Sequence, residues 1–501
     1  MAGSSAPVIP RQGRATRGRS STNFPVDPSM KPPEPTPSDD PTPPSGAERS
    51  SLSLEEFHGS VAVPPAAAGF WAQWRVFVGP ALLVSVGYMD PGNWGTDLDA
   101  GARYRYALLW VVALASAMAM SMQVIAAKLG VATGKDLAQA CRDWYPRWTR
   151  WPNWLLCELA IGACDLAEVL GSAVALNLLF RIPIFWAVCI TALDVLLLLA
   201  LQGFGMRTIE AVVSVLVATI AACYFVEIFV LPPTSPHLGE IGRALSSPGF
   251  REPGMVYLAI GIVGATVMPH NLYLHSALVQ SRRFQRDDRS IRTAIRLNTF
   301  DSVVALTVAF FINAAILVLA AMVFHGRDHV VVAGGGSVPL GEDTDWIRVA
   351  YLTLAPLLGT VAASILFAVA LLASGQSSTI TGTLAGQVVM EGFMRWRLRP
   401  WVRRVITRGL AVLPAVLVIG VRGDASVTDL LTLSQVILAL QLPFAMFPLL
   451  HFTSSRRHMG QWRNGWFLLL TGWGSAVVIT ALDLYGIPES LSSAWHIITG
   501  R

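Results

Sequence analysis

Charge is what this 501-residue sequence has least of. Only 14% of its residues are Asp, Glu, Lys or Arg, whereas 53% are hydrophobic, and the mean hydropathy is +0.52. Soluble domains typically carry about 25% charged residues, so the composition excludes an ordinary soluble protein of this size. The sequence instead predicts a polytopic membrane protein that lies in a lipid bilayer.

Lysine is scarce among the basic residues, because it occurs only at Lys31, Lys128 and Lys135. Nearly all of the positive charge is therefore arginine, and the arginines of the apolar region lie in short connectors between apolar runs. Basic residues in such connectors are typical of topology determinants. The formal net charge of +5 therefore does not indicate a nucleic-acid partner.

Several functional signatures are also missing. The sequence contains no P-loop pattern, no nucleophile–base pair and no cofactor fingerprint, which argues against an ATPase, a membrane enzyme and a bound cofactor. No obligatory protein partner is indicated. The five cysteines form no CxxC or metal-ligand pairing, and we interpret them as packing residues: Cys141, Cys157, Cys164, Cys189 and Cys223.

The N-terminal region lacks the apolar core of a signal peptide and is rich in Pro, Ser and Arg as far as about Ser60. We expect a disordered cytoplasmic tail over residues 1–69. The remainder is predicted to form a first five-helix repeat, an extracellular connector, a second five-helix repeat, and a last helix with the C-terminus: 70–231, 232–254, 255–453 and 454–501.

The apolar segments predict eleven transmembrane helices, each near the length of about 20 residues that a bilayer requires. Helix 1 is expected in two halves, 76–89 and 94–103, and helix 6 at 255–278 with an interruption. The other helices are expected at 107–131, 153–180, 182–201, 209–231, 299–324, 357–394, 405–421, 427–452 and 466–484.

The distribution of arginine predicts the orientation. Arginines concentrate after helices 2, 6, 8 and 10, which places these connectors and the N-terminus in the cytoplasm and the C-terminus outside. Helices 1–5 and 6–10 then enter the membrane from opposite sides and form an inverted 5+5 repeat. The predicted fold is an all-α polytopic membrane protein of the LeuT type, located in the cytoplasmic (inner) membrane.

Helices 1 and 6 are interrupted in a similar manner, by Asp90-Pro91-Gly92-Asn93 and by Met268-Pro269-His270-Asn271. A carboxylate at membrane depth costs roughly 2.5 to 3.5 kcal/mol, so we expect Asp90 to be functional. Where a helix stops inside a bilayer, its free carbonyls must face protein, a cavity or an ion. Broken helices in corresponding positions of two repeats indicate the binding site of a secondary transporter.

The residue types at the breaks favour a transition-metal ion. Asp90 and Asn93 are three residues apart, so a partly helical turn can present both oxygens to one point. Met268 precedes the helix-breaking Pro269, and the carbonyl of Ala265 is freed one turn earlier. A thioether beside such oxygens suits Mn(II), Fe(II), Co(II) or Cd(II) better than Mg(II) or Ca(II). Three alternatives stay open: Asp90 paired with an arginine, Asn93 as a helix cap, and Met268 as a packing residue.

Helices 6 and 3 carry further titratable residues. His270 and His275 lie about 140° apart on a helix, so they are not expected to hold one ion together, but each can exchange a proton near neutral pH. Glu158, Asp165 and Glu168 form a chain of carboxylates that can carry protons toward the cytoplasm. The alternatives are hydrogen-bonded core histidines and neutralisation of Glu158 by the arginines of helix 9: Arg403, Arg404 and Arg408.

At these residues the sequence resembles the Nramp family of proton-coupled divalent-metal transporters. The matching segments extend from helix 1 to helix 10: DPGNW from Asp90, CDLAEVLG from Cys164, MPHNLYLHS from Met268, GQSSTITGTLAGQVVMEGF from Gly375 and LSQVILALQLPFA from Leu433. The pairing of DPGN with MPHN is highly specific. Gly95 departs from the pattern, since this family often has alanine there.

The resemblance implies an importer of Mn(II) and Fe(II) that works by alternating access, with protons as coupling ions. It implies metal ligation by Asp90, Asn93, Met268 and the Ala265 carbonyl, joined in some states by the Gly87 carbonyl or Gln435. It also implies proton transfer through Asp90, Asp165 and Glu168, with His270, His275 and Glu158 in the surrounding network. The Ser-, Thr- and Gly-rich run in helix 8 would be a packing and gating element.

Other functions compete with this interpretation. One is a sodium-coupled organic-solute symporter on the same fold, although the acid at Asp90 would repel an anionic substrate group. Another is an Mg(II)-transporting relative, against which Met268 argues. An ion channel would need a continuous polar pore, which the segments do not indicate.

Overall fold

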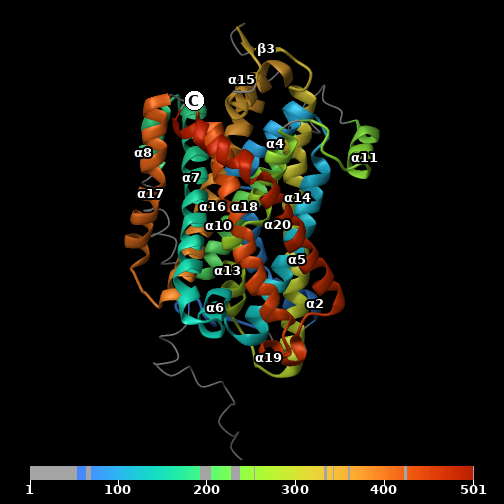
Figure 1. Cartoon of the computed structure of the whole chain (residues 1–501), viewed down its shortest axis with the longest axis vertical. Coiled ribbons are helices and arrows are strands. Elements are labelled where there is room, and N and C mark those ends of the chain that lie inside the picture. Colours follow the sequence, from blue (N-terminus) through green and yellow to red (C-terminus); the bar gives the residue numbers. More distant parts are fainter. Residues whose placement is uncertain are drawn as a thin grey trace, which may run out of the picture. The chain divides into compact units, whose positions relative to one another are not determined.

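The computed structural model describes residues 53–63, 69–191, 205–226, 237–252, 254–331, 336–341, 344–358, 361–422 and 426–499. All of them belong to one compact unit, residues 44–501. The described residues are predominantly helical and include two short strand pairings (Figure 1). The predicted all-α class is confirmed.

The first repeat begins with a divided helix. The divided helix consists of α3 (Pro80–Gly87) and α4 (Pro91–Tyr104), and the short α2 (Phe70–Phe77) precedes it. The chain continues with α5 (Leu109–Thr133), α6 (Leu137–Trp144), η1 (Arg147–Thr149), α7 (Arg150–Phe180), α8 (Ile184–Thr191), α10 (Met206–Phe225) and α11 (Leu238–Ser246). The predicted continuations over 192–201 and 227–231 lie outside the described residues.

The second repeat begins with another divided helix, α12 (Met255–Val267) and α13 (Pro269–Leu278), followed by η3 (Val279–Ser281). The next elements are α14 (Asp288–Val323), α15 (Trp346–Leu358), α16 (Val361–Met394), α17 (Pro400–Arg422) and α18 (Ser426–Ser454). α19 (Arg456–Met459), η4 (Gly460–Trp462) and α20 (Trp466–Thr499) follow. Between α14 and α15, β3 (His329–Val331) pairs antiparallel with β4 (Ser337–Pro339), with Val330 opposite Val338.

Eight helices of the described part are long and apolar enough to cross a membrane. Three of the predicted spans do not meet this criterion, each for its own reason. The two halves of helix 1 have only 8 and 14 residues. Helix 4 runs from α8 into undescribed residues, and the apolar part of α17 is the shorter stretch Val405–Gly420. The count of eleven therefore stays a prediction.

Two predicted helix starts are wrong. The expected start of helix 1 at Val76 falls inside α2, because Gly79, with φ 142°, turns the chain and Pro80 begins α3. α14 begins at Asp288, well before the expected 299. Asp287 caps it, since its Oδ2 accepts hydrogen bonds from the backbone N–H of Arg289 and Ser290. A hydropathy criterion misses such a polar first stretch of helix.

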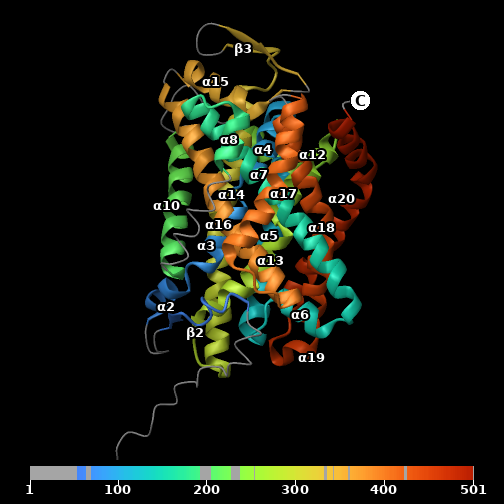
Figure 2. The ribbon, with the colours of Figure 1, turned by 90° about the vertical axis from the view of Figure 1, so that its left-hand side faces the viewer.

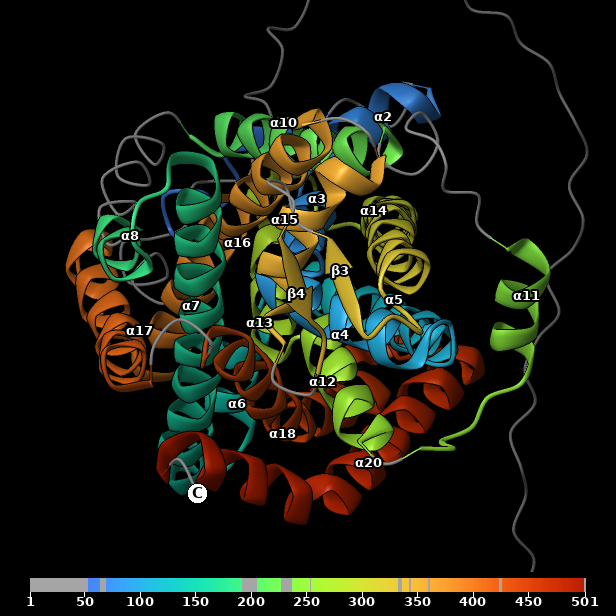
Figure 3. The ribbon, with the colours of Figure 1, turned by 90° about the horizontal axis from the view of Figure 1, so that it is seen from above.

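The divided helices occupy the middle of the bundle, with α5, α7, α14, α16 and α18 around them (Figure 3). Glycines permit the close approach. A Cβ on Gly261 of α12 would lie 3.2 Å from Cγ2 of Thr96 in α4, and a Cβ on Gly264 would collide with the backbone of Gln435 in α18. The broken helices of the two repeats are thereby packed directly against each other.

Residues 53–63 differ from the expected disordered tail, because they are ordered against the helices; we call them the N-terminal strap. Val61 and Ala62 form β1, which pairs in parallel with β2 (Arg282–Arg283). Leu54 and Phe57 are buried, and the backbone N–H of Leu54 donates to Oε2 of Glu391 in α16 at 2.9 Å. The strap lies at the end of the bundle that carries β2, α6 and α19 (Figure 2).

Further contacts tie the strap to three different parts of the fold. The Glu55 carboxylate forms an ion pair with Arg397, after α16, at 2.6 Å. Ser53 Oγ accepts a hydrogen bond from Gln139 in α6 at 3.2 Å. The backbone N–H of Gly59 donates to the carbonyl of Gln280 in η3 at 3.0 Å. The strap therefore links the connector after helix 2 to both helices 6 and 8.

Replacing Phe57 by alanine should release the strap, because a buried aromatic side chain contributes about 3–5 kcal/mol where it is well packed. Hydrogen exchange of the peptide that covers residues 53–63 measures this, since protected amides exchange only after local opening. We expect slow exchange in the wild type and at least tenfold faster exchange in Phe57→Ala. Glu56→Ala, at an exposed neighbouring position, is the control. Equal exchange in all three proteins would contradict the described packing.

Candidate metal site between the two broken helices

The first break is a three-residue link, Tyr88 to Asp90, between α3 and α4. Asp90 caps α4, because its Oδ1 accepts a hydrogen bond from the backbone N–H of Asn93 at 2.9 Å. The sequence pattern predicts that Pro91 and Gly92 stop a helix, but they begin the next one, and Pro91 takes the first helical position. The carbonyls freed by the break therefore belong to residues that precede Pro91.

Side chains from other helices satisfy the carbonyls of this link. The carbonyl of Tyr88 accepts a hydrogen bond from Nδ2 of Asn313 in α14 at 2.8 Å. The carbonyl of Met89 accepts one from Oγ of Ser374 in α16 at 2.5 Å and one from Nε1 of Trp94 at 3.3 Å. Because unpaired backbone groups are costly at membrane depth, these contacts fix the path of the link.

The second break is a single residue, Met268, which joins α12 to α13. Its φ of 35° and ψ of 104° are unusual for a residue with a Cβ, and Pro269 begins α13. The side chain is fully buried, and its Sδ accepts a hydrogen bond from Nδ2 of Asn271 at 3.4 Å. A Cβ on Gly87 would lie only 3.1 Å from this sulfur. The thioether is thus held against the end of α3, at the other break.

Three oxygens from both breaks converge on the side-chain amide of Asn93. Its Nδ2 lies 2.7 Å from Oδ1 of Asp90, 3.2 Å from the carbonyl of Ala265 and 3.4 Å from the carbonyl of Gly87. An amide NH2 group has only two protons for these three acceptors. The convergence of a carboxylate and two carbonyls on one point is the arrangement that a cation requires.

Other acceptors near this point are buried without a hydrogen bond among the described residues. These acceptors are Oδ2 of Asp90, Oδ1 of Asn271 and Oε1 of Gln435. Gln435 lies against the first break, because a Cβ on Gly92 would collide with its amide. An unpaired buried acceptor costs about 1–3 kcal/mol, so a group of them indicates a place for a ligand.

The carboxylates of α7 are distributed over two clusters. Glu168 Oε2 accepts a hydrogen bond from Oγ1 of Thr379 at 2.9 Å and lies 3.5 Å from Nη1 of Arg408. The same nitrogen donates to the backbone carbonyl of Asp165 at 3.3 Å. Glu158, nearer the start of α7, pairs with Arg403 at 3.0 Å. The neutralisation of Glu158 by helix 9, which the sequence left open, is therefore present.

The Ser-, Thr- and Gly-rich run of α16 lies directly against these groups. A Cβ on Gly375 would collide with Ser172, and a Cβ on Gly382 would lie 2.8 Å from Oε1 of Glu168. A Cβ on Gly386 would collide with the guanidinium of Arg403. The packing role predicted for this run is confirmed, and its glycines leave room for the side chains of Glu168 and Arg403.

The two histidines of α13 belong to different surroundings. Nδ1 of His275 is 2.9 Å from Oε1 of Gln123, and Nε2 of that glutamine donates to the hydroxyl of Tyr88 at 2.7 Å. His270 is buried, and its Nδ1 has no hydrogen-bond partner among the described residues. His275 is thus connected to the link of the first break through Gln123, and His270 is not.

For several residues at the site, the sequence did not predict a role. Asn313 donates to Oδ1 of Asn93 at 3.3 Å as well as to the Tyr88 carbonyl. Asn271 holds the Met268 thioether, and Asp97 and Asp99 are further buried carboxylates on α4. A lone asparagine in the apolar run of α14 was a usable signal, because polar residues at membrane depth are rarely without a role.

Within the described ranges, no group of three or more His, Cys, Asp or Glu residues is arranged to hold a metal ion. The point at the Asn93 amide on which the oxygens converge, the convergence point, is instead formed by one carboxylate and two carbonyls, with the Met268 thioether at the adjoining break. All five cysteines are free thiols, and four of them are buried.

The chain is similar to proteins of one known family. A family profile described as "Natural resistance-associated macrophage protein-like" matches residues 81–489. The divalent metal cation transporter MntH of Nostoc sp. is 50% identical over 441 residues, which cover 88% of this chain and 96% of the relative. MntH of Xanthomonas campestris is 51% identical over 429 residues, or 85% of this chain and 93% of the relative.

Solved structures identify the fold. The manganese transporter of Eremococcus coleocola is 38% identical and has a TM-score of 0.78, covering 89% of this chain and 92% of that one. MHP1, a nucleobase-cation-symport-1 family transporter, is 14% identical with a TM-score of 0.52, covering 82% of this chain and 93% of that one, and shows the fold alone. The predicted LeuT-type fold is confirmed.

Gly92→Ala should weaken binding of Mn(II) at the convergence point by about tenfold or more, because the added Cβ must displace the Gln435 amide. Isothermal titration calorimetry of the purified protein measures this affinity. Gly95→Ala is the matched control, since its Cβ would meet only Leu431, at 3.5 Å, in ordinary contact. An equal loss of Mn(II) affinity in both variants would mean that any methyl group added to α4 weakens binding, so that the effect of Gly92→Ala could not be assigned to the Gln435 contact.

Proposed function

This chain belongs to the Nramp family, and on that premise we propose that it imports Mn(II) and Fe(II) together with protons, by alternating access. It is an integral membrane transporter of divalent metal ions and not an enzyme. The observation that carries the proposal is the convergence of the Gly87 carbonyl, Oδ1 of Asp90 and the Ala265 carbonyl on one point. The buried Met268 thioether lies at the adjoining break.

Asn93 supports the assignment through the atom that it places at this point. Its amide nitrogen lies where the oxygens converge, as a weak substitute for a cation. A metal ion would displace the nitrogen, and a half-turn of the amide would present Oδ1 as a further ligand. That turn breaks the contact between Oδ1 of Asn93 and Asn313. Gln435 can add its unpaired Oε1 without a change of partner.

The ligand chemistry favours transition metals. Asp90 supplies the negative charge, and the amides and carbonyls supply neutral oxygens, a set that hard cations such as Mg(II) and Ca(II) also accept. The thioether of Met268 is a soft donor that adds affinity mainly for Mn(II), Fe(II), Co(II) or Cd(II). The site is weaker than a His/Cys cage, as release into the cytoplasm requires.

Protons are proposed to leave the site along α7. Gly171 packs against Pro91, since a Cβ there would collide with the proline ring, and Glu168 lies one turn away on the same helix. A metal ion that binds Asp90 favours its ionised form, so a proton on Asp90 must move. Asp165 and Glu168 beside Arg408 are the proposed acceptors, with His270, His275 and the Glu158–Arg403 pair in the surrounding network.

The orientation is also a proposal, carried by charge. The arginine-rich connectors, the strap and α6 lie at one end of the bundle, and β3, α11 and α15 lie at the other (Figure 1). The excess of arginine at the first end favours a cytoplasmic N-terminus and an outside C-terminus in the inner membrane. The membrane potential then favours cation entry by about 2.3 kcal/mol per charge and 100 mV.

Uptake of Mn(II) into proteoliposomes with an internal pH dye and excess external Mg(II) tests the proposal. We expect saturable entry with acidification of the lumen and little competition by Mg(II). Asp90→Ala should abolish uptake, because it removes the carboxylate from the convergence point. Met268→Ala should retain uptake but allow Mg(II) and Ca(II) to compete about tenfold better.

Met118→Ala, which shortens a buried methionine of α5, controls for packing loss. Transport unchanged in both Asp90→Ala and Met268→Ala would remove the site assignment. Strong competition by Mg(II) in the wild type would reopen the choice of metal.

Glu168→Gln should separate metal transport from proton transport. Glutamine keeps the shape and the contact with Thr379 but cannot take up a proton. In the same liposome assay we expect Mn(II) entry to continue while acidification per Mn(II) falls several-fold. Glu158→Gln is the matched comparison, because its closer ion pair, 3.0 Å to Arg403 against 3.5 Å between Glu168 and Arg408, predicts a smaller effect on coupling. Unchanged acidification in Glu168→Gln would make this carboxylate structural.

A further inference from the structure

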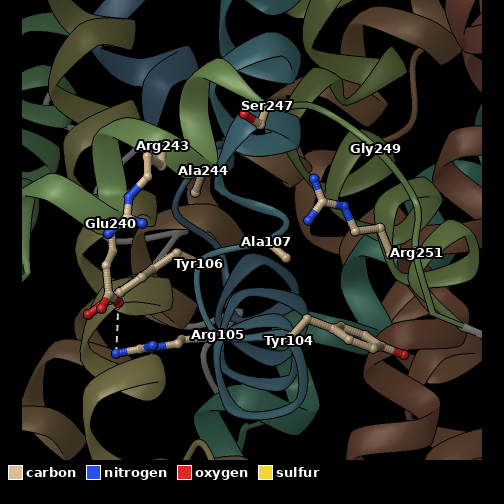
Figure 4. Close-up of a pocket in the computed structure, with 10 residues that line it drawn as sticks. All are labelled: Tyr104, Arg105, Tyr106, Ala107, Glu240, Arg243, Ala244, Ser247, Gly249 and Arg251. Atoms are coloured by element: carbon tan, nitrogen blue, oxygen red, sulfur yellow. Dashed lines mark ion pairs between the residues drawn. The ribbon is translucent and has the colours of Figure 1, made fainter.

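A cleft of about 490 Å³ opens at the opposite end of the bundle from the strap, where α4 ends and α5 begins (Figure 4). Its volume falls within the range of about 300–1,000 Å³ that is typical of small-molecule sites. One wall is the turn between the two helices, and the other is α11 with the loop that follows it. The lining residues that carry the argument are Tyr104, Arg105, Glu240, Arg243, Ser247 and Arg251.

The cleft carries an excess of positive charge, because it is lined by three arginines and one glutamate. That glutamate, Glu240, forms an ion pair with Arg105 at 2.7 Å. Arg243 and Arg251 form no ion pair with an acid among the described residues. The Nε–H of Arg243 donates a hydrogen bond to the carbonyl of Gly239 in its own helix. Figure 4 shows the guanidinium of Arg251 extending toward the space between Ala107 and Ser247. Two cations thus face the cleft without a counter-charge.

The turn that forms one wall is held in an unusual conformation. Arg105 ends α4 with φ 54° and ψ −121°, values that a side chain with a Cβ rarely adopts. Its guanidinium lies over the ring of Tyr106, 5.3 Å from the ring centroid, and pairs with Glu240 across the cleft. These two contacts hold the strained turn and keep α11 beside α5, so the cleft is a built feature of the fold.

The level of the cleft in the membrane follows from its position in the chain. The wall formed by residues 104–107 directly precedes the span Leu109–Thr133, so the cleft lies at the surface of the bilayer. α11 exposes Leu238 and Leu245, which are 75% and 41% accessible, on its apolar side. Phe250 packs on Trp110 with a centroid distance of 5.4 Å. Exposed leucines and aromatic rings beside arginines are typical of elements that lie in the membrane interface.

We propose that this cleft binds the phosphate group of an anionic lipid headgroup. The guanidinium of Arg251, which extends into the cleft, matches phosphate oxygens in geometry and charge, and the hydroxyl of Ser247 is a further donor; Arg243 adds a second positive charge to the lining. The exposed leucines of α11 lie against the acyl region of the same lipid. The orientation proposed above puts the lipid in the outer leaflet, but the binding itself does not depend on that orientation or on transport.

The thermal unfolding of the purified full chain in detergent tests the proposal, with native mass spectrometry to count bound lipids. Dioleoylphosphatidylglycerol should raise the unfolding midpoint by about 2 °C or more relative to dioleoylphosphatidylcholine, and phosphatidylglycerol adducts should persist in the mass spectrum. The double variant Arg243→Ala/Arg251→Ala should lose both effects. It leaves the Arg105–Glu240 pair intact, so the wall of the cleft is kept.

Arg327→Ala, at an exposed arginine between α14 and β3 outside the cleft, is the matched control and should behave like the wild type. A third arm replaces the lipid by inorganic phosphate at equal ionic strength. Stabilisation by inorganic phosphate without any by phosphatidylglycerol would keep the phosphate site but overturn the lipid as its source. Equal stabilisation by both lipids, or a phosphatidylglycerol effect that survives in the double variant, would overturn the site itself.

Discussion

Backbone carbonyls that lose their helical partners inside a membrane must find others, and the centre of this protein is built on that requirement. At the first break, the Tyr88 and Met89 carbonyls are satisfied by Asn313 of α14 and Ser374 of α16. Both donors come from the second repeat, whereas the break belongs to the first. The interruption of one helix is therefore stabilised by the other half of the molecule, and neither half can form this centre alone.

The carbonyls of Gly87 and Ala265 are satisfied less completely by hydrogen bonds. They share one amide NH2 group with a carboxylate oxygen, at distances of 3.4 and 3.2 Å. A net hydrogen bond contributes only about 0.5–1.5 kcal/mol, and here two protons serve three acceptors. The centre is thus rigid where Asn313 and Ser374 hold it and incompletely satisfied where a cation would bind. An ion that took the place of this amide would leave the contacts of Asn313 and Ser374 with the Tyr88 and Met89 carbonyls intact.

The features that depend on local chemistry could be predicted from the sequence. Proline inside an apolar run located both breaks, with an acid beside it at the first, and arginine in short connectors predicted the inverted repeat. Sequence did not locate the start of α3, because the turn depends on the positive φ of Gly79. Asn313, Ser374 and Gln123 were missed because their partners lie in other repeats or far along the chain. Tertiary hydrogen bonds of this kind leave no periodic signal in the sequence.

The N-terminal strap has a consequence for how the bundle opens. Its contacts reach α6, η3 and α16, elements that must separate if a route to the cytoplasm passes between them. Only residues 64–69 lie between the strap and α2, so a released strap stays at an effective concentration on the order of millimolar. The strap thus adds its contacts to the arrangement in which α6, η3 and α16 are held together, and the short tether keeps it beside them.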